Sequence, residues 1–356
     1  MFACCPNITT LDTSVLLEEQ DADSLGRFIA EVCPKIAGLV VGSAGDAEYS
    51  LLGFRIMDSL ATQQIANYNY EGDLRIDHGP AVNISFQRHS TTLRSITLTG
   101  GGLYNRISLS VILRDCRYLE VLSVGFCDIS GFFAPLDDVL RHPWSSARFN
   151  SLSLGISGCE LPEEPNVKPY YLRPAPVTLT DDEIQRFAQL GELYQRIGAL
   201  AELRKLDLLM VPLDENGEVV EPENEQHFVM SFPAMLSLEV TSQGLPGFLH
   251  LFSGLKNLKD LRGSTPETGR PGYLHHMAGL KKLEILEGLV RMDADETKVA
   301  MEWKEFQCMT DCWPHLQHVR LFAYKYNVTE PFEWLQWSHM DGHGTHVLGY
   351  LRKVHQ

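Results

Sequence analysis

Short apolar motifs recur along the chain at nearly constant spacing. Most follow the full pattern apolar-x-x-apolar-x-apolar, in which the last two apolar positions alternate with other residues, and three keep only its first two apolar positions. Alternation with a period of two is typical of a short strand that buries one face. The motifs are Ile8/Leu11, Ile36/Leu39/Val41, Leu93/Ile96/Leu98, Leu119/Leu122/Val124, Phe149/Leu152/Leu154, Leu203/Leu206/Leu208, Met235/Leu238/Val240, Leu258/Leu261, Leu283/Leu286 and Leu316/Val319/Leu321.

The spacing of these motifs predicts a repeat of about 28 residues. Successive motifs begin 23 to 33 residues apart, except across two gaps of 57 and 54 residues. Each gap is close to twice the usual spacing, which indicates that a degraded or expanded repeat lies within it. In the first gap, the segment from Tyr68 to Ile76 is the candidate repeat, with Leu74 and Ile76 as its strand.

Apolar residues with helical spacing lie between the strand motifs. Pro34 ends one such segment, a capping box that starts at Thr180 opens another, and Pro314 ends a third. The apolar positions are Leu25, Phe28, Ile29 and Val32 in the first segment, Ile184, Phe187, Leu190, Leu193, Ile197 and Leu200 in the second, and Trp303, Phe306 and Met309 in the third.

One strand and one helix per repeat cannot bury their apolar faces alone, so neighbouring copies must stack side by side. The sequence therefore predicts an α/β leucine-rich-repeat solenoid. Its expected form is a right-handed horseshoe with a parallel sheet on the concave side and helices on the convex side. We expect this domain to span residues 1–337 and to be followed by an irregular C-terminal tail at 338–356, where the repeat rhythm stops.

Several motifs also carry a cysteine close to the strand. Examples are Cys5-Pro6-Asn7-Ile8, Cys33-Pro34-Lys35-Ile36, Cys116-Arg117-Tyr118-Leu119 and Cys312-Trp313-Pro314-His315-Leu316, while Cys127 and Cys159 follow strands. In these motifs, and in the segments 119–127 and 203–208, the chain resembles the fungal F-box/leucine-rich-repeat proteins of the cysteine-containing, RNI-like type. The resemblance covers residues 1–335 and implies that the thiols pack at the tight helix-to-strand turns.

The resemblance also implies a function. In that family an N-terminal F-box docks to the adaptor of a cullin-based (SCF) ubiquitin ligase, while the repeats hold the substrate. This chain shows no segment like an F-box, so either the F-box is missing from this sequence or this member lacks one. We expect a protein–protein interaction module that acts as the substrate-recognition part of such a ligase, with the adaptor as a partner only if an F-box is present elsewhere. The alternative is a stand-alone scaffold or regulator unrelated to ubiquitin.

The residues between the buried strand positions would face the concave surface. The early repeats place small or neutral residues there, namely Ser95, Thr97, Val121, Ser123, Ser151 and Ser153. The later repeats place mixed-sign charges there, which give a partner specificity and orientation more than affinity. The predicted partner-binding residues are Lys205, Asp207, Glu239, Asp260, Arg262, Glu287, His318 and Arg320. A solvated strand face without a ligand is the alternative.

Two insertions follow strands. The segment 155–180 is rich in proline and contains Tyr170 and Tyr171, which suit a lid beside the concave face or a plain surface loop. The segment 211–228 carries a run of acidic residues, which is typical of a solvated loop and would otherwise meet a basic partner segment.

The composition of the chain limits the classes of partner that we expect. The net charge of -16 argues against nucleic acid, and the absence of a run of about 18 apolar residues argues against a membrane span. The eight cysteines are scattered rather than densely paired, so we expect reduced thiols in a cytoplasmic or nuclear protein. The expected assembly is a monomer.

Two motifs invite a catalytic or metal-binding interpretation. The segment 341–349 is similar to the histidine motif of subtilisin-like proteases, with His343 at the general base, and it makes a hydrolase a remote third alternative. Only 13 residues follow His343, and the serine and aspartate motifs of that mechanism are missing. Cys308, Cys312, His315 and His318 have zinc-like spacing, but a helix and a strand would point them in different directions. We therefore expect no enzyme, no metal and no cofactor.

Overall fold

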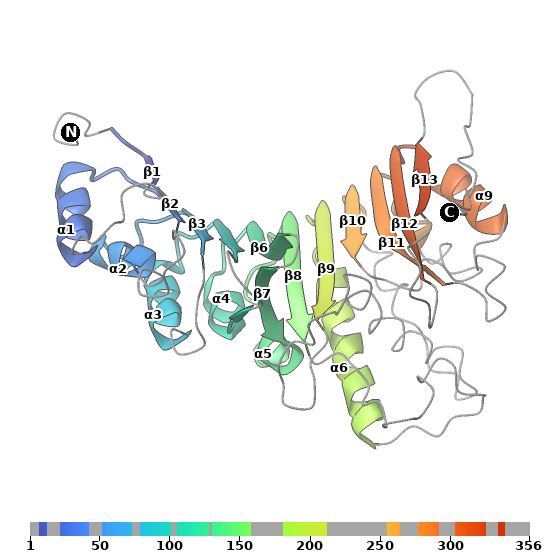
Figure 1. Ribbon diagram of the computed structural model, residues 1–356, viewed down its shortest axis with the longest axis horizontal. Helices are drawn as coiled ribbons and strands as arrows, with labels where there is room; N and C mark the ends of the chain where they lie inside the picture. The colour runs from blue at the N-terminus through green and yellow to red at the C-terminus, as the bar shows by residue number, and fades with distance from the viewer. Residues whose placement is uncertain are drawn as a thin grey trace, which may run out of the picture. The chain divides into compact units, whose positions relative to one another are not determined.

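The computed structural model describes residues 7–12, 22–42, 52–72, 79–100, 105–127, 130–157, 181–211, 255–263, 277–291, 303–324 and 334–338 of the 356-residue chain. The chain divides into two compact units, an N-terminal unit from Met1 to Ile156 and a C-terminal unit from Ser157 to Gln356. In both units strands and helices follow one another along the sequence, so the fold class is α/β, as the motif pattern predicts (Figure 1).

The N-terminal unit begins with a regular succession of strands and helices. Its described elements are β1 (Thr10–Asp12), α1 (Ala22–Val32), β2 (Gly38–Gly42), α2 (Leu52–Ser59), β3 (Asn67–Glu71), α3 (Gly79–His89), β4 (Ser95–Thr99), β5 (Asn105–Arg106), α4 (Ser110–Asp115), β6 (Val121–Cys127), β7 (Ser130–Pro135), α5 (Leu136–Leu140) and β8 (Ser151–Ser157).

The strands β1, β2, β3, β4, β6 and β8 lie side by side in sequence order, and each neighbouring pair is parallel. The register keeps equivalent positions level, so that Leu39, Tyr68, Ile96, Leu122 and Leu152 form one row across the sheet. All five side chains are buried. The parallel sheet expected from the alternating motifs is thus confirmed for this unit.

The first long gap contains a strand in the parallel sheet, as the repeat spacing predicts. It is β3, at Asn67–Glu71, whereas Leu74 and Ile76 lie outside the described residues. Ile65, Tyr68 and Tyr70 complete the usual motif and are buried. The pattern was missed because two tyrosines fill positions that aliphatic residues occupy in the other repeats.

The helices of the N-terminal unit lie along one side of its strands, and each packs against the next (Figure 1). Close contacts require glycine at two points. A Cβ on Gly26 of α1 would lie 2.5 Å from the Cβ of Ser59 in α2, and one on Gly53 of α2 would lie 2.6 Å from Val41 of β2. Ile29 is buried as predicted, but Phe28 of the same predicted stripe is 43% exposed, because α1 turns its Ile29 side towards the core.

Two short strands interrupt the regular succession. β7 pairs antiparallel with the end of β6, with Phe126 opposite Gly131, and β5 pairs parallel with β7. The following helix, α5, begins directly at Leu136. A sheet made only of repeated parallel strands was expected, so this hairpin is a departure from the prediction. Phe132 and Phe133 of β7 are buried, which explains why the hairpin folds back onto the unit.

The C-terminal unit also contains parallel strands, and its described helices lie before β9 and before β12. Its elements are α6 (Asp181–Gly198), β9 (Lys205–Val211), β10 (Asp260–Gly263), β11 (Ile285–Arg291), α9 (Trp303–Cys312), β12 (His318–Tyr324) and β13 (Trp334–Ser338). β9, β10, β11 and β12 are parallel neighbours in sequence order. β13 pairs antiparallel with β12, so the parallel succession stops before Ser338.

A repeated pair of hydrogen bonds joins neighbouring repeats just before each strand. The carbonyl oxygen of Ala37 accepts hydrogen bonds from the backbone N–H groups of Ala66 and Asn67, at 2.7 and 3.0 Å. In the C-terminal unit, the carbonyl oxygen of Lys259 accepts from Glu284 and Ile285 at 2.7 and 2.9 Å. Equivalent carbonyls occur at Thr9, Ala66, Arg94 and Glu120. The same backbone link thus recurs in both units.

The helix-to-strand turns are buried, as the cysteine motifs predict. Cys33 and Cys116 are 0% and 1% exposed, and their carbonyl oxygens accept hydrogen bonds from Ile36 and Leu119. Burial raises the pKa of the Cys116 thiol to about 12, so this thiol stays protonated and unreactive. In the last repeat the prediction was wrong, because Trp313 rather than Cys312 fills the buried position. Cys5 and Cys159 lie outside the described residues.

Candidate functional site

The strand side chains that alternate with the buried ones form what we call the outer strand face. In the N-terminal unit this face is small and polar, with Asn67, Asn69, Ser95, Thr97 and Ser123 exposed or half-buried. Ser95, Thr97, Val121 and Ser123 were expected to offer small or neutral groups there, and all four are half-buried, while Asp12 and Glu71 add exposed charges at the ends of β1 and β3. Ser153 was expected there as well, but it is only 8% exposed and is therefore not available to a partner.

The outer strand face of the C-terminal unit carries charge instead. Lys205 of β9 is exposed and Asp207 is half-buried, while Leu206 and Leu208 between and beyond them are buried. Lys205 lies in register with Asp260 of β10, and Asp207 lies in register with Arg262. Opposite charges therefore occupy neighbouring strands at both positions.

The predicted residues continue as two rows across the strands. The first row contains Lys205, Asp260, Ile285 and His318, because Ile285 is in register with both Asp260 and His318. The second row contains two register pairs, Asp207 with Arg262 and Glu287 with Arg320. We call these the charge rows.

Each register pair of the second charge row joins an acidic and a basic residue. The backbones of neighbouring parallel strands lie about 4.8 Å apart. The row is balanced, with two acidic and two basic residues, and ends at Arg320, opposite Gln336 of β13. Such a surface favours a partner with a matching sequence of charges over one that is uniformly basic or acidic.

The remaining predicted contact residues lie outside the described residues. Glu239 and the two tyrosines proposed for a lid, Tyr170 and Tyr171, belong to segments that the structure does not describe. The protease-like motif around His343 also lies outside the described residues.

A buried carboxylate that the sequence did not reveal joins two helices. Asp138 of α5 is 4% exposed and accepts hydrogen bonds from the backbone N–H groups of Leu109 and Ser110, at 2.7 and 3.1 Å, at the start of α4. Its other oxygen accepts from the Ser108 hydroxyl at 3.0 Å. Leu109 provides no side-chain cap of its own, so Asp138 supplies the cap from the following helix. The sequence offered one clue, because the N-cap position of α4 holds Leu109 and not Ser, Thr, Asp or Asn.

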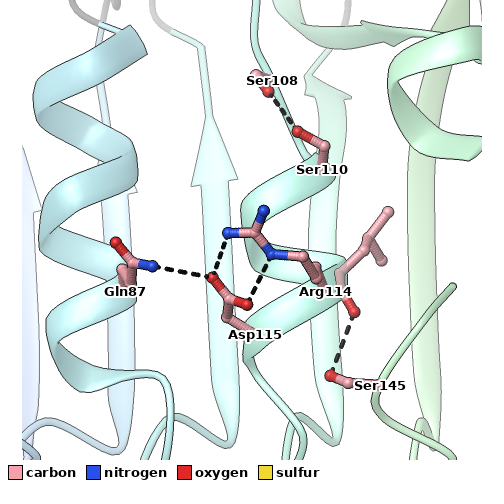
Figure 2. A network of polar contacts seen from close by, with 7 residues as sticks. Gln87, Ser108, Ser110, Arg114, Asp115 and Ser145 are labelled. Atoms are coloured by element: carbon pink, nitrogen blue, oxygen red, sulfur yellow. Dashed lines mark hydrogen bonds and ion pairs between the residues drawn. The ribbon is translucent and has the colours of Figure 1, made fainter. Parts of the chain in front are cut away.

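The same helix ends in a polar network that Figure 2 shows from close by. Two nitrogens of Arg114 donate to the two carboxylate oxygens of Asp115, each at 2.8 Å, and Gln87 of α3 donates to the same carboxylate at 3.4 Å. The hydrogen bond from Arg114 lowers the pKa of Asp115. Ser145 donates to the carbonyl oxygen of Leu113, so the end of α4 is linked to both neighbours. This network fixes structure and leaves no charge uncompensated.

His89 makes a second buried connection that the sequence did not reveal. Its Nδ1 lies 3.3 Å from the backbone nitrogens of Gln64 and Ile65, and its Nε2 lies 3.0 Å from the carbonyl oxygen of Met57. Two N–H donors aim at Nδ1, so the ring is neutral, with its proton on Nε2. Burial is the main reason that the pKa of His89 is lowered. A helix-terminal histidine before a strand gave no sign of this role.

The zinc-like spacing does not produce a metal site in the described residues. The Cys308 thiol donates to Cys312 Sγ at 3.7 Å, and His315 is exposed. Over the ranges given above, no group of three or more His, Cys, Asp or Glu residues is arranged to hold a metal ion. None of the described helices combines the length and the apolar composition that a membrane span requires.

No family model matches the sequence, and no curated protein matches it. The two charge rows are therefore the main functional observation.

Proposed function

We propose that the chain is a leucine-rich-repeat protein of the horseshoe type that binds a protein partner on the charge rows of its C-terminal unit. The observation that supports this is the register of β9 to β12, which aligns opposite charges across neighbouring strands. The repeated parallel strands and the helix-to-strand turns support the repeat class. The proposed role is binding and not catalysis.

The resemblance to F-box/leucine-rich-repeat proteins adds a further proposal, that the partner is a substrate of a cullin-based ubiquitin ligase. This part rests on the sequence motifs alone. Recovery of the ligase adaptor with the full chain from cells would support it. Recovery of a stable partner without the adaptor would instead support a stand-alone scaffold. The four free cysteines among the described residues agree with a cytoplasmic or nuclear location.

A charge exchange at the start of β9 tests the binding surface. The variant Lys205→Glu/Asp207→Lys keeps the net charge but inverts the pairing with Asp260 and Arg262. The matched control is Glu202→Lys/Arg204→Glu, which makes the same kind of exchange three residues earlier, at exposed positions of the turn before β9. Both variants should keep the melting temperature of the natural chain to within a few degrees.

The measurement is quantitative affinity capture with mass spectrometry, repeated at low and high salt. We expect partners that bind the charge rows to lose about tenfold in recovery with the first variant, since a mismatched charge pair costs on the order of 1–2 kcal/mol. The turn variant should retain them. Equal recovery with both variants would show that the charge rows pair only with one another and bind no partner.

A further inference from the structure

Two arginines converge on one tyrosine at the turns that precede β6 and β8. The guanidinium carbon of Arg117 lies 4.9 Å from the centre of the Tyr118 ring, and that of Arg148 lies 5.3 Å from it. Arg117 and Tyr118 belong to the turn between α4 and β6, whereas Arg148 lies 30 residues further along, before β8. Both arginines are exposed and Tyr118 is half-buried, so the cluster faces solvent.

The repeat brings these residues together. Tyr118 and Arg148 each precede the first buried residue of their repeat, and the carbonyl oxygen of Glu120 accepts hydrogen bonds from Asn150 and Ser151 to hold the two turns side by side. At the same position in other repeats a lysine donates to an asparagine of the preceding repeat. These pairs are Lys35–Asn7, at 2.6 Å, and Lys282–Asn257, at 2.8 Å. Between Tyr118 and Arg148 the guanidinium lies over the ring instead.

The nearby carboxylates are already used. The Asp115 carboxylate accepts hydrogen bonds from two nitrogens of Arg114, as Figure 2 shows. The Glu120 carboxylate pairs with Arg94 at 2.7 Å. Within the described part of the chain, no carboxylate pairs with the guanidinium of Arg117 or Arg148. Stacking against a ring leaves the in-plane N–H groups of a guanidinium free to donate. Two sets of donors thus surround one aromatic ring.

The local charge differs from that of the whole chain. Residues 79–157 contain seven arginines, no lysine and five acidic residues, whereas the full chain has a net charge of -16. An acidic ligand would be repelled by most of the protein but attracted to this region. Electrostatics would therefore direct such a ligand to the cluster.

We propose that Arg117, Tyr118 and Arg148 form a docking site for an acidic peptide segment of a partner protein. Aspartate or glutamate carboxylates of the segment accept hydrogen bonds from the two guanidiniums, and an apolar part of the segment covers the Tyr118 ring. This site lies at the turns and is made of residues other than the charge rows. It does not depend on the proposed function of the outer strand face.

Carboxylates fit the site better than a phosphate group. Phosphate sites usually add backbone N–H groups that point at the anion. Here the N–H of Arg117 donates to the carbonyl oxygen of Asp115 at 3.0 Å, and the N–H of Arg148 donates to the Ser146 hydroxyl at 3.2 Å. The guanidinium donors, in contrast, are spread around a ring. Separate carboxylates along a peptide match that spacing more closely than one compact dianion.

The test uses the full chain and a fluorescein-labelled hexaglutamate peptide, with binding followed by fluorescence anisotropy at low ionic strength. The test variant is Arg117→Gln/Arg148→Gln. Its matched control is Arg55→Gln/Arg106→Gln, which removes two exposed arginines of the same unit and changes the net charge equally. Circular dichroism melting curves show whether each variant folds.

We expect the test variant to weaken hexaglutamate binding by about tenfold and the control variant to change it less than about twofold. Tyr118→Phe should bind as the natural chain does, and Tyr118→Ala should bind more weakly, because the guanidiniums lose the ring that orients them. Equal binding by the test and control variants would overturn the proposal, since the attraction would then be non-specific. Binding of a phosphoserine peptide but not of hexaglutamate would overturn the choice of carboxylates.

Discussion

The two units share a backbone plan but differ in the side chains that surround it. In both, a carbonyl before each strand accepts hydrogen bonds from the next repeat, and a buried residue fills each helix-to-strand turn. The outer strand face of the N-terminal unit consists mainly of small polar residues, with acidic residues only at the ends of β1 and β3, whereas the register pairs of the C-terminal unit join acidic and basic residues. The buried positions therefore maintain the repeat, while the alternate positions are free to diverge.

The cores differ as well. The N-terminal unit buries a group of aromatic rings, in which Phe54 of α2 lies 5.3 Å from Tyr68, 5.5 Å from Tyr70 and 5.7 Å from Phe86 between ring centres. The described core of the C-terminal unit consists mainly of leucines, such as Leu206 and Leu286. Rings that replace aliphatic residues in one unit show how much variation the same repeat tolerates.

The largest expected effect concerns this aromatic group. Phe54→Ala should lower the free energy of unfolding by about 3–5 kcal/mol, because it removes a fully buried ring and leaves a cavity. Urea unfolding followed by circular dichroism would measure it. The control is Tyr68→Phe, which removes a buried hydroxyl that has no hydrogen-bond partner in the described residues. It should leave stability unchanged or raise it by up to about 1 kcal/mol. A loss below about 1 kcal/mol for Phe54→Ala would contradict the importance of the rings.

A smaller effect is expected where the N-terminal unit departs from the simple repeat. Asp138→Ala should destabilise the protein by about 1–3 kcal/mol, since it leaves the N–H groups of Leu109 and Ser110 buried without an acceptor. Asp137→Ala is the matched control, because that neighbour on α5 is exposed. Hydrogen exchange of the α4 amides would report the change directly. If both variants exchange equally, the cap from α5 does not stabilise α4.

The third prediction concerns pH and His89. The pKa of His89 is lowered in the folded protein, mainly by burial, so the unfolded chain binds a proton more readily. The neutral ring therefore contributes its full stability above the unfolded pKa of about 6.5, and this contribution is lost as the pH falls below that value. Melting curves recorded between neutral and mildly acidic pH should show that the melting temperature falls as the pH falls. His89→Gln should melt at a lower temperature at neutral pH and show a shallower decline, whereas an equal decline in both proteins would disprove the assignment.

The smallest effect should be the same in the two units. Arg94–Glu120 and Lys259–Glu284 occupy equivalent positions in their repeats and are both largely exposed. Double-mutant cycles with alanine should give a coupling energy below about 1 kcal/mol for each pair, because solvent screens exposed charges. Adding salt should reduce both values. A coupling energy of several kcal/mol in either unit would mean that one of these turns is more strongly coupled than its exposure indicates.

The sequence predicted the repeat because leucine, isoleucine and valine mark the buried strand positions. It failed where other residues take those positions, as at Tyr68 and Tyr70, and where strands pair outside the repeat, as in β7 and β13. The charge rows were predicted from alternation alone. The sequence did not predict which of these residues lie opposite one another, because that depends on the register between strands.

Contacts that join neighbouring repeats through side chains were missed. Asp138 lies 28 to 30 residues from the groups that it binds, and Arg148 lies 30 residues from Tyr118. These separations equal the repeat length, so aligning the repeats would have placed Tyr118 and Arg148 at the same position. Choosing among the many pairs at that spacing still requires the turn geometry.

The antiparallel strand β13 changes how the edge of β12 can pair with other strands. A solenoid of parallel strands would leave the amides of β12 as a template for a strand from another molecule. Residues Trp334 to Ser338 pair with β12 in the opposite direction, so those amides are occupied and the spacing of the hydrogen bonds changes. A further repeat cannot continue the stack on β12 in the same register. β13 therefore protects that strand from end-to-end growth into filaments.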